Sequence, residues 1–353
     1  MAYQKKGKQK ETGVRYKDAV LALKQNGPQR LYVLYGVEDY LREQFLAQLK
    51  AACLPEGESE FSFHRFDGAT LELHTLADAI DAMPFLTERS FIEVRGLDTN
   101  KLPEAEAARF VELISDIPDY CTLALVMGTE FSPDGRLKVT KALKKSGELL
   151  EFSAQDGDSL IKWIARRFDA WEKRISRTDA EYLITITGGL MNRMIPEIDK
   201  ISAYAKDSVV TRADIDAVTE KVPDAVVFEM TDLLAAGDAD GAMGKLAELL
   251  TDKNNVPIML LAVVGQQLRR LYAAKVAASE HLGVSDVMDL CGLRFDFIAQ
   301  KLLQQARRFP LEVLEQAVVR CAEADYSMKH DAAVDDLGLL QEILLGVMVG
   351  AAR

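Results

Sequence analysis

Apolar and polar positions follow two different periods along the chain. Between residues 31 and 152, compact apolar runs alternate with stretches in which apolar residues recur every three or four positions. The compact runs predict strands at 31–35, 61–66, 90–95, 122–127 and 149–152. The periodic stretches predict helices at 39–52, 76–83, 103–115 and 136–145. Strands that alternate with helices are typical of βαβ units, so this part is predicted to be an α/β domain with a parallel sheet.

From residue 153 onward the period is helical, and no run predicts a strand. A first group of predicted helices lies at 159–171, 178–187, 192–205 and 212–220. After a natural joint at Val222-Pro223-Asp224, a second group with the apolar spacing of a helical bundle lies at 226–236, 239–251, 256–279, 294–308, 311–329 and 334–351. The predicted organisation is a disordered basic tail, an α/β domain, a small helical domain and a helical bundle, at 1–13, 14–152, 153–221 and 222–353.

The connection between the predicted helix at 76–83 and the strand at 90–95 carries two adjacent large apolar residues, Phe85 and Leu86. Pro84 ends the helix, because the residue before a proline is disfavoured in the helical region. Two interpretations are open. The pair either anchors the connection to the core of its own domain, or forms a hydrophobic wedge that inserts into another protein. Burying each such side chain is worth about 1.5–3 kcal/mol, so two together would anchor a partner.

The charge distribution limits the classes of partner. The chain has 353 residues, enough for two or three domains, and a net charge of −12. Its first 17 residues are basic, so the remainder is strongly acidic. An acidic body binds nucleic acid poorly by itself, because phosphate contacts supply most nonspecific affinity. The predicted helix at 136–145 is a local exception, in which Lys141, Lys144 and Lys145 either form a solvated face or contact DNA.

Cysteine and histidine spacing argues against disulfides and metal sites. The cysteines are scattered without paired spacing, at Cys53, Cys121, Cys291 and Cys321. The histidines likewise lack metal-ligand spacing, at His64, His74, His281 and His330. The basic start has no apolar stretch of a secretory signal, and the longest apolar run, 256–264, is too short to span a bilayer. A cytoplasmic protein without a metal ion and without a membrane partner is predicted.

The first predicted connection from strand to helix is where an α/β nucleotide-binding domain holds phosphates. A phosphate loop needs a lysine followed by serine or threonine, and the segment from Gly36 to Glu43 has none. Glu38 and Asp39 would also repel phosphate. No nucleophile elbow occurs, and the pair Asp335-Asp336 suits a helix N-cap. The sequence therefore predicts no ATP site, no catalytic residues and no cofactor.

Six short motifs follow one another along the chain in a characteristic order and spacing. They lie at 34–41, 83–89, 188–201, 226–238, 257–271 and 325–329. The first contains Tyr35-Gly36-Val37-Glu38-Asp39-Tyr40-Leu41 and the second is Met83-Pro84-Phe85-Leu86-Thr87-Glu88-Arg89. Together they resemble the delta subunit family of bacterial DNA polymerase III across residues 30–350.

The resemblance implies a fold and a role. The fold would be an α/β N-terminal RecA-like AAA+ domain without a functional phosphate loop, followed by an all-α lid domain and an all-α collar domain. The role would be that of a clamp-loader component, not catalytic by itself, within the nucleotidyltransferase complex that replicates DNA. Such a subunit binds and opens the sliding clamp (beta) for loading onto primed DNA. Its other partners would be the motor subunits (gamma/tau) and delta-prime in a heteropentamer, and primer–template DNA within the assembled loader.

The resemblance also implies which residues bind the clamp. They are Phe85 and Leu86, with Met83 as a neighbour and Arg89 at the rim of the contact. Independently of the resemblance, Lys141, Lys144 and Lys145 of the basic helix would either face DNA inside the assembled loader or form a solvated face. The order Phe-Leu departs from the order Leu-Phe of some family members, but both side chains are large and apolar. Two other classes of function remain open on the residues alone: an ATP-binding AAA+ ATPase with a degenerate phosphate loop, and a non-catalytic helical scaffold.

Overall fold

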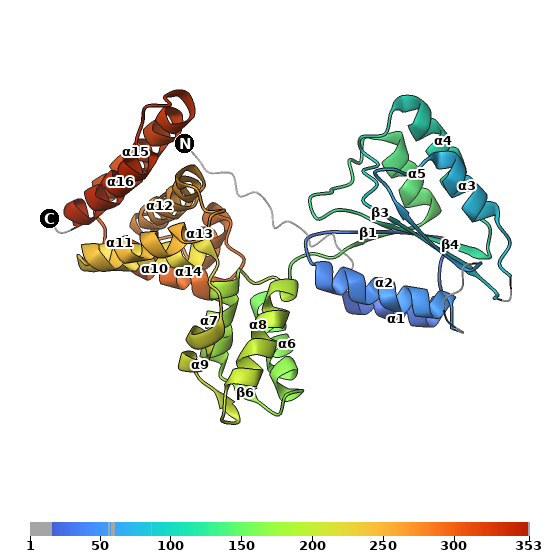
Figure 1. Ribbon diagram of the computed structural model, residues 1–353, viewed down its shortest axis with the longest axis horizontal. Helices are drawn as coiled ribbons and strands as arrows, with labels where there is room; N and C mark the ends of the chain where they lie inside the picture. Colours follow the sequence, from blue (N-terminus) through green and yellow to red (C-terminus); the bar gives the residue numbers. More distant parts are fainter. Residues whose placement is uncertain (1–15, 56, 58–60, 86, 352–353) are drawn as a thin grey trace. The chain divides into compact units, whose positions relative to one another are not determined.

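A computed structural model of the chain describes residues 16–55, 57, 61–85 and 87–351 (Figure 1). The chain forms two compact units, Met1–Ala154 and Gln155–Arg353. The predicted basic tail at 1–13 lies outside the described residues. In the described part of the chain, no helix combines the length and the apolar character needed to cross a membrane.

The first unit is built on a five-stranded sheet in which every recorded pairing is parallel, with the order β2-β3-β4-β1-β5. Its strands are β1 (Leu31–Tyr35), β2 (Phe63–Asp67), β3 (Ser90–Arg95), β4 (Cys121–Val126) and β5 (Glu148–Glu151). The central strands are almost wholly buried because both faces of the sheet are covered. The predicted α/β domain with a parallel sheet is confirmed.

Helices cover both faces of this sheet (Figure 1). One face carries α1 (Tyr16–Asn26) and α2 (Asp39–Cys53), and the other carries α3 (Leu73–Asp81), α4 (Glu104–Ser115) and α5 (Lys138–Ser146). Strand β1 serves both faces because its side chains alternate. Leu31 and Val33 pack with Leu76 and Phe110 on one face, whereas the ring of Tyr32 lies 5.9 Å from that of Phe45, on α2.

Some boundaries differ from the prediction. Phe61 was expected within a strand, but β2 begins at Phe63. Helix α2 begins at Asp39, as predicted, with Glu38 as its N-cap, and Asp39 forms an ion pair with Arg42. Helix α3 ends at Asp81, before Pro84 can interrupt it, so the connection to β3 is longer than the sequence indicated.

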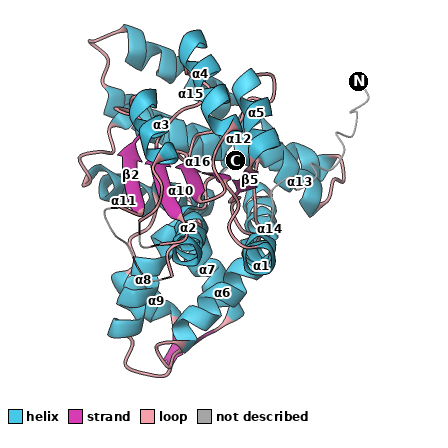
Figure 2. Ribbon diagram, turned by 90° about the vertical axis from the view of Figure 1, so that its right-hand side faces the viewer, coloured by secondary structure: helices cyan, strands magenta, loops and turns pink. Residues whose placement is uncertain are grey.

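The second unit begins with α6 (Gly157–Asp169), α7 (Arg177–Thr187), α8 (Met191–Tyr204) and α9 (Arg212–Val218). The expectation that no strand follows residue 153 is wrong. A small parallel pair, β6 (Arg174–Ile175) and β7 (Val209–Val210), lies among these helices (Figure 2). Strands of two residues are too short to show any periodicity, which explains why the sequence pattern missed them.

A larger group of helices follows in the second unit: α10 (Pro223–Ala236), α11 (Ala239–Leu250), α12 (Pro257–Ser279), α13 (Val284–Cys291), α14 (Asp296–Ala306), α15 (Leu311–His330) and α16 (Asp336–Ala351). They enclose one core of aliphatic side chains, in which Leu268 and Leu271 of α12 are fully buried. Helix α13 was not predicted; it has eight residues, of which only Val287 is buried. The expected cap of α16 is confirmed, since Asp335 accepts a hydrogen bond from the amide of Gly338 at 3.0 Å.

Candidate functional site

The connection between α3 and β3 lies at the amino edge of the sheet. In a parallel sheet every strand starts at the same edge, so a segment that leads into a strand arrives there. Phe85 leads into β3, whereas Gly36 follows β1 and lies at the opposite, carboxyl edge. The predicted wedge and the position of a phosphate loop are therefore at opposite edges of one sheet.

The described wedge residues are exposed. Met83 is 78% exposed and Phe85 is 60% exposed, so neither anchors the connection to the core. Leu86 lies outside the described residues. Within the connection, the Thr87 hydroxyl donates to the carbonyl of Arg89 at 3.1 Å. The interpretation that Phe85 anchors the connection to its own domain does not agree with this exposure.

Arg89 differs from the other predicted clamp-binding residues in its surroundings. Its guanidinium turns toward the sheet, where Nη1 donates to Oγ1 of the buried Thr122 at 3.1 Å. Thr122 in turn donates to the carbonyl of Gln29 at 3.0 Å. Arg89 is partly buried, so it ties the end of the connection to β4, in addition to any role at the surface. No sequence pattern indicated this contact, because its partners lie 33 residues apart.

An aromatic neighbour of Phe85 was missed by sequence reasoning. The ring of Phe61, in the segment that leads into β2, contacts the ring of Phe85 edge-on, with centroids 6.0 Å apart and planes at 74°. Phe61 is 62% exposed. The apolar pattern assigned Phe61 to a strand, in which every second side chain faces the core, so Phe61 was expected to be buried. Its exposure follows from the strand beginning two residues later.

The carboxyl edge of β1 is occupied by the chain itself. Gly36 has φ of +113°, and a Cβ there would lie 2.5 Å from the carbonyl oxygen of Phe152. The amide of Glu38 donates to the same carbonyl at 2.9 Å, and the Glu38 side chain is fully buried. Arg42 Nη1 donates to the carbonyl of Gly36 at 2.9 Å. Glycine is thus required here for the close approach of Phe152, and a carboxylate is buried where a phosphate loop would hold an anion.

The three predicted DNA-facing lysines share one helix. Lys141, Lys144 and Lys145 lie on α5, and all three are exposed. Within the described residues none of their ammonium groups is recorded in an ion pair or hydrogen bond. The buried side of α5 is formed by Val139, Thr140 and Leu143, which pack toward the sheet. The structure therefore shows an unneutralised basic face on an otherwise acidic chain.

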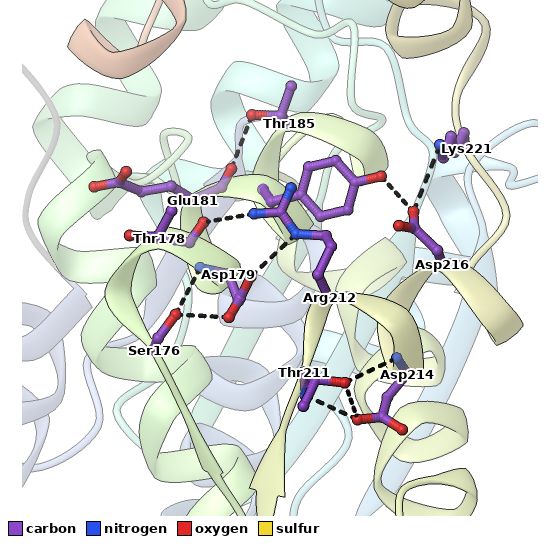
Figure 3. Close-up of polar contacts among 11 residues, drawn as sticks. Ser176, Thr178, Asp179, Glu181, Thr185, Thr211, Arg212, Asp214, Asp216 and Lys221 are labelled. Carbon is purple, nitrogen blue, oxygen red and sulfur yellow. Dashed lines mark hydrogen bonds and ion pairs between the residues drawn. The ribbon is translucent and has the colours of Figure 1, made fainter.

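A polar network in the second unit joins α7 to α9 and to Lys221, in the segment between α9 and α10 (Figure 3). The guanidinium of Arg212 lies 3.5 Å from the ring centre of Tyr182, and its Nε donates to Asp179 at 3.0 Å. The hydroxyl of Tyr182 donates to Asp216, which lies 3.6 Å from the Lys221 ammonium. Burial alone would lower the pKa of Lys221, but its hydrogen bonds to Glu229 and Tyr182 raise that pKa above its usual value. These groups satisfy one another, so the network stabilises helix packing.

A cavity of about 350 Å³ lies beside this network in the second unit. Its charged lining residues include Arg212, Arg308, Lys301 and Glu229. Both arginines are paired, Arg308 with Asp232 at 3.5 Å and Arg212 within the network. Opposite charges that line one cavity do not select a single class of ligand. Among the described residues no cluster of three or more histidine, cysteine or acidic side chains is arranged to hold a metal ion.

Two family models match the chain. The model described as "DNA polymerase III, delta subunit" matches residues 32–153, and the model described as "DNA polymerase III delta subunit, C-terminal domain" matches residues 224–345. Together they cover well over half of the chain. The chain belongs to the DNA polymerase III delta subunit family.

Individual relatives agree with this assignment to the delta family. The chain is 24% identical to DNA polymerase III subunit delta of Bacillus subtilis over 338 residues, which cover 93% of this chain and 95% of the relative. It is 19% identical to a probable DNA polymerase III subunit delta of Aquifex aeolicus, over 84% of this chain and 85% of the relative. Among solved structures, the DNA clamp loader delta protein of Bacillus subtilis matches with a TM-score of 0.56 and 21% identity, covering 95% of this chain and 99% of the other. That structure supports the fold.

Proposed function

We propose that the chain is the clamp-loader subunit that binds the sliding clamp and favours its open state. The observation that carries the proposal is the exposed connection at 83–89 in a chain of the delta family. Met83 and Phe85 expose large apolar side chains to solvent, in the connection that leads into β3 at the amino edge of the sheet. An apolar surface of this kind usually marks an interaction site. The family supplies the identity of the partner, a ring-shaped sliding clamp.

The proposed wedge consists of Phe85 and Leu86, with Met83 as a neighbour and Arg89 at its base. Interfaces concentrate their binding energy in a few buried anchors that polar groups surround. Burying one such side chain contributes about 1.5–3 kcal/mol, so the pair would supply a large part of the affinity. To favour ring opening, the subunit must bind the open clamp better than the closed one, because a ligand shifts an equilibrium only by its differential affinity.

The chain is proposed to act without hydrolysing ATP. Support comes from the carboxyl edge of β1, where Phe152 approaches Gly36 and the buried Glu38 replaces the groups that would bind phosphate. On this proposal the first unit is a RecA-like AAA+ domain without a functional phosphate loop. Residues 153–221 form the lid domain and residues 222–353 form the collar. ATP-driven steps would belong to the motor subunits of the same loader.

The remaining partners follow from the proposed role. The collar would join the motor subunits and delta-prime in a heteropentamer, and the basic face of α5 would meet primer–template DNA inside the assembled loader. The exposed and unneutralised ammonium groups of Lys141, Lys144 and Lys145 support this DNA contact. The proposed location is the cytoplasm, where a replication subunit meets its DNA.

A binding titration against the sliding clamp of the same organism tests the proposal. The wild-type chain is expected to bind, and the pair Phe85→Ala, Leu86→Ala is expected to lose at least about a hundredfold in affinity, as two anchors of about 1.5 kcal/mol each would give. The pair Leu21→Ala, Val37→Ala is the control, because both side chains are exposed and apolar in the same unit but precede the connection by more than 40 residues. Binding by the wild type that survives the wedge substitutions would contradict the proposed site.

A further inference from the structure

Phe61 and Phe85 are unusual among the phenylalanines of this chain. The chain has 14 phenylalanines, all within the described residues, and only these two are exposed. They come from segments 24 positions apart in the sequence, yet their rings touch with centroids 6.0 Å apart. The two exposed phenylalanines thus form one surface.

The sheet explains why the two rings meet. Strands β2 and β3 are parallel neighbours, and Phe63 of β2 is paired with Phe91 of β3. Because both strands start at the amino edge, the segment before β2 and the segment before β3 lie next to each other. Phe61 and Phe85 therefore lie in neighbouring segments at this edge, each shortly before its strand begins.

The contact between these rings does not bury them. In the core of the same unit the ring of Phe45 lies 5.7 Å from that of Phe152, and these residues are 0% and 3% exposed. Phe61 and Phe85 lie at a similar separation but keep 62% and 60% of their surface exposed. An edge-on pair contributes about 0.5–1.5 kcal/mol beyond burial, so it fixes the mutual orientation of the rings while most of their area stays open to a partner.

We propose that Phe61 is a further clamp-contacting residue, which forms a continuous docking surface with Phe85 and Met83. This inference rests on the proposed function, since the occupant is the same apolar pocket of the sliding clamp. Two segments then contribute to the surface, the connection before β3 and the segment before β2. Phe61 enlarges the apolar area that the clamp covers and holds the Phe85 ring at the angle in which it docks.

The test compares single and double variants of the full chain in a titration against the sliding clamp. Phe61→Ala is expected to weaken binding about tenfold, which corresponds to the loss of one contacting side chain. Phe85→Ala is expected to weaken it at least as much. Because the two rings act together, the double variant is expected to lose less than the product of the two single losses. Tyr204→Ala is the matched control, since Tyr204 is an aromatic residue of the second unit that is 54% exposed.

The outcomes separate this inference from the proposed function. If Phe85→Ala weakens binding while Phe61→Ala leaves it unchanged, the proposed function stands and the role of Phe61 is refuted. If the folded wild-type chain does not bind the clamp, the proposed function fails, and the inference fails with it. Thermal unfolding of each variant checks that the loss does not come from unfolding.

A photo-crosslink distinguishes contact with the clamp from support of Phe85 alone. A p-benzoyl-phenylalanine residue introduced at position 61 is expected to form a covalent adduct with the clamp on irradiation, and the same residue at position 204 is not. A variant that binds the clamp but gives no adduct from position 61 would overturn the proposed contact.

Discussion

An arginine at the carboxyl edge of the sheet forms ion pairs with two glutamates of the first unit. Arg95, the last residue of β3, donates from Nη1 and Nη2 to the two carboxylate oxygens of Glu43, each at 2.8 Å. Its Nε also contacts the buried Glu93. One arginine therefore connects α2 with β3. Bidentate hydrogen bonds between arginine and a carboxylate are stronger than single ones.

The first prediction at this scale concerns pH. The hydrogen bonds from Arg95 lower the pKa of Glu43 below its usual value of 4.5. A carboxylate whose pKa is lower in the folded state stabilises the fold above its unfolded pKa, and this stabilisation is lost as the pH falls through the folded pKa. Glu43→Gln should therefore be less stable than the wild type at pH 7, and this deficit should shrink below pH 4.5.

Denaturant unfolding of both proteins between pH 7 and pH 3 measures the deficit. The control is the same substitution in an Arg95→Ala background, where the hydrogen-bonding guanidinium is missing and the pH-dependent deficit should become much smaller, since only the more distant charges of Arg42 and Arg65 still lower the pKa of Glu43. A deficit that stays constant across this pH range would show that Glu43 contributes by packing and not by its charge. The size of the effect is expected to be modest, since both side chains are partly exposed and solvent screens them.

Residues also mark the limit of sequence reasoning. The sequence singled out Phe85 because a large apolar residue next to a proline in a short connection is conspicuous. It could not reveal that Phe61 lies against Phe85, because that contact depends on β2 and β3 being neighbours in the sheet. It also gave Arg89 only a surface role, whereas the guanidinium donates to Thr122 on the neighbouring strand. Contacts between strands that are distant in sequence leave no local pattern.

Elements in which the apolar spacing continues over several turns or a whole buried strand were predictable, and the elements that the sequence pattern missed are all short. Strand β4 is buried at all six positions, and the compact apolar run at 122–127 predicted it to within one residue. Helix α12 has 23 residues and a steady apolar spacing, so its position was also clear. By contrast, α13 and the pair β6 and β7 are too short for any period to develop. Their positions are set by packing within the second unit, which a local pattern does not record.

The second prediction concerns helix α5. Replacing Lys141, Lys144 and Lys145 with alanine should weaken primer–template DNA binding by the assembled loader and make the dependence of log affinity on log salt less steep by up to about three, one for each lost phosphate contact. Clamp binding should not change, because the wedge lies in a different connection. Fluorescence anisotropy with labelled DNA at several salt concentrations measures the DNA affinity and its dependence on salt.

The matched control for the lysine variant is Lys101→Ala. Lys101 is 83% exposed in the same unit, but its ammonium is paired with Asp98 at 2.9 Å. It carries the same charge as the lysines of α5, so its removal tests whether net charge alone matters. Equal losses from Lys101→Ala and from a single α5 substitution would mean that the basic face of α5 has no specific role.

At the scale of the whole molecule, the proposed tasks are divided between two compact units. The first unit holds the wedge at one edge of its sheet, and the second unit has its own core of buried helices. On the proposed function, clamp binding belongs to the first unit and subunit assembly to the second, so substitutions in one unit should leave the task of the other unchanged. The net charge of −12 agrees with the proposed function, since an acidic chain leaves most of the DNA contact to its partners.

The third prediction follows from this division of tasks. The full chain with Phe85→Ala and Leu86→Ala should still co-elute with the motor subunits and delta-prime in size-exclusion chromatography, because the substitutions leave the second unit intact. The loader that contains this variant should bind ATP as before but fail to bind the clamp. The loader assembled with wild-type chain is the reference for both measurements. If the variant failed to assemble, the wedge would be part of a subunit interface, and the proposed separation between the two units would have to be abandoned.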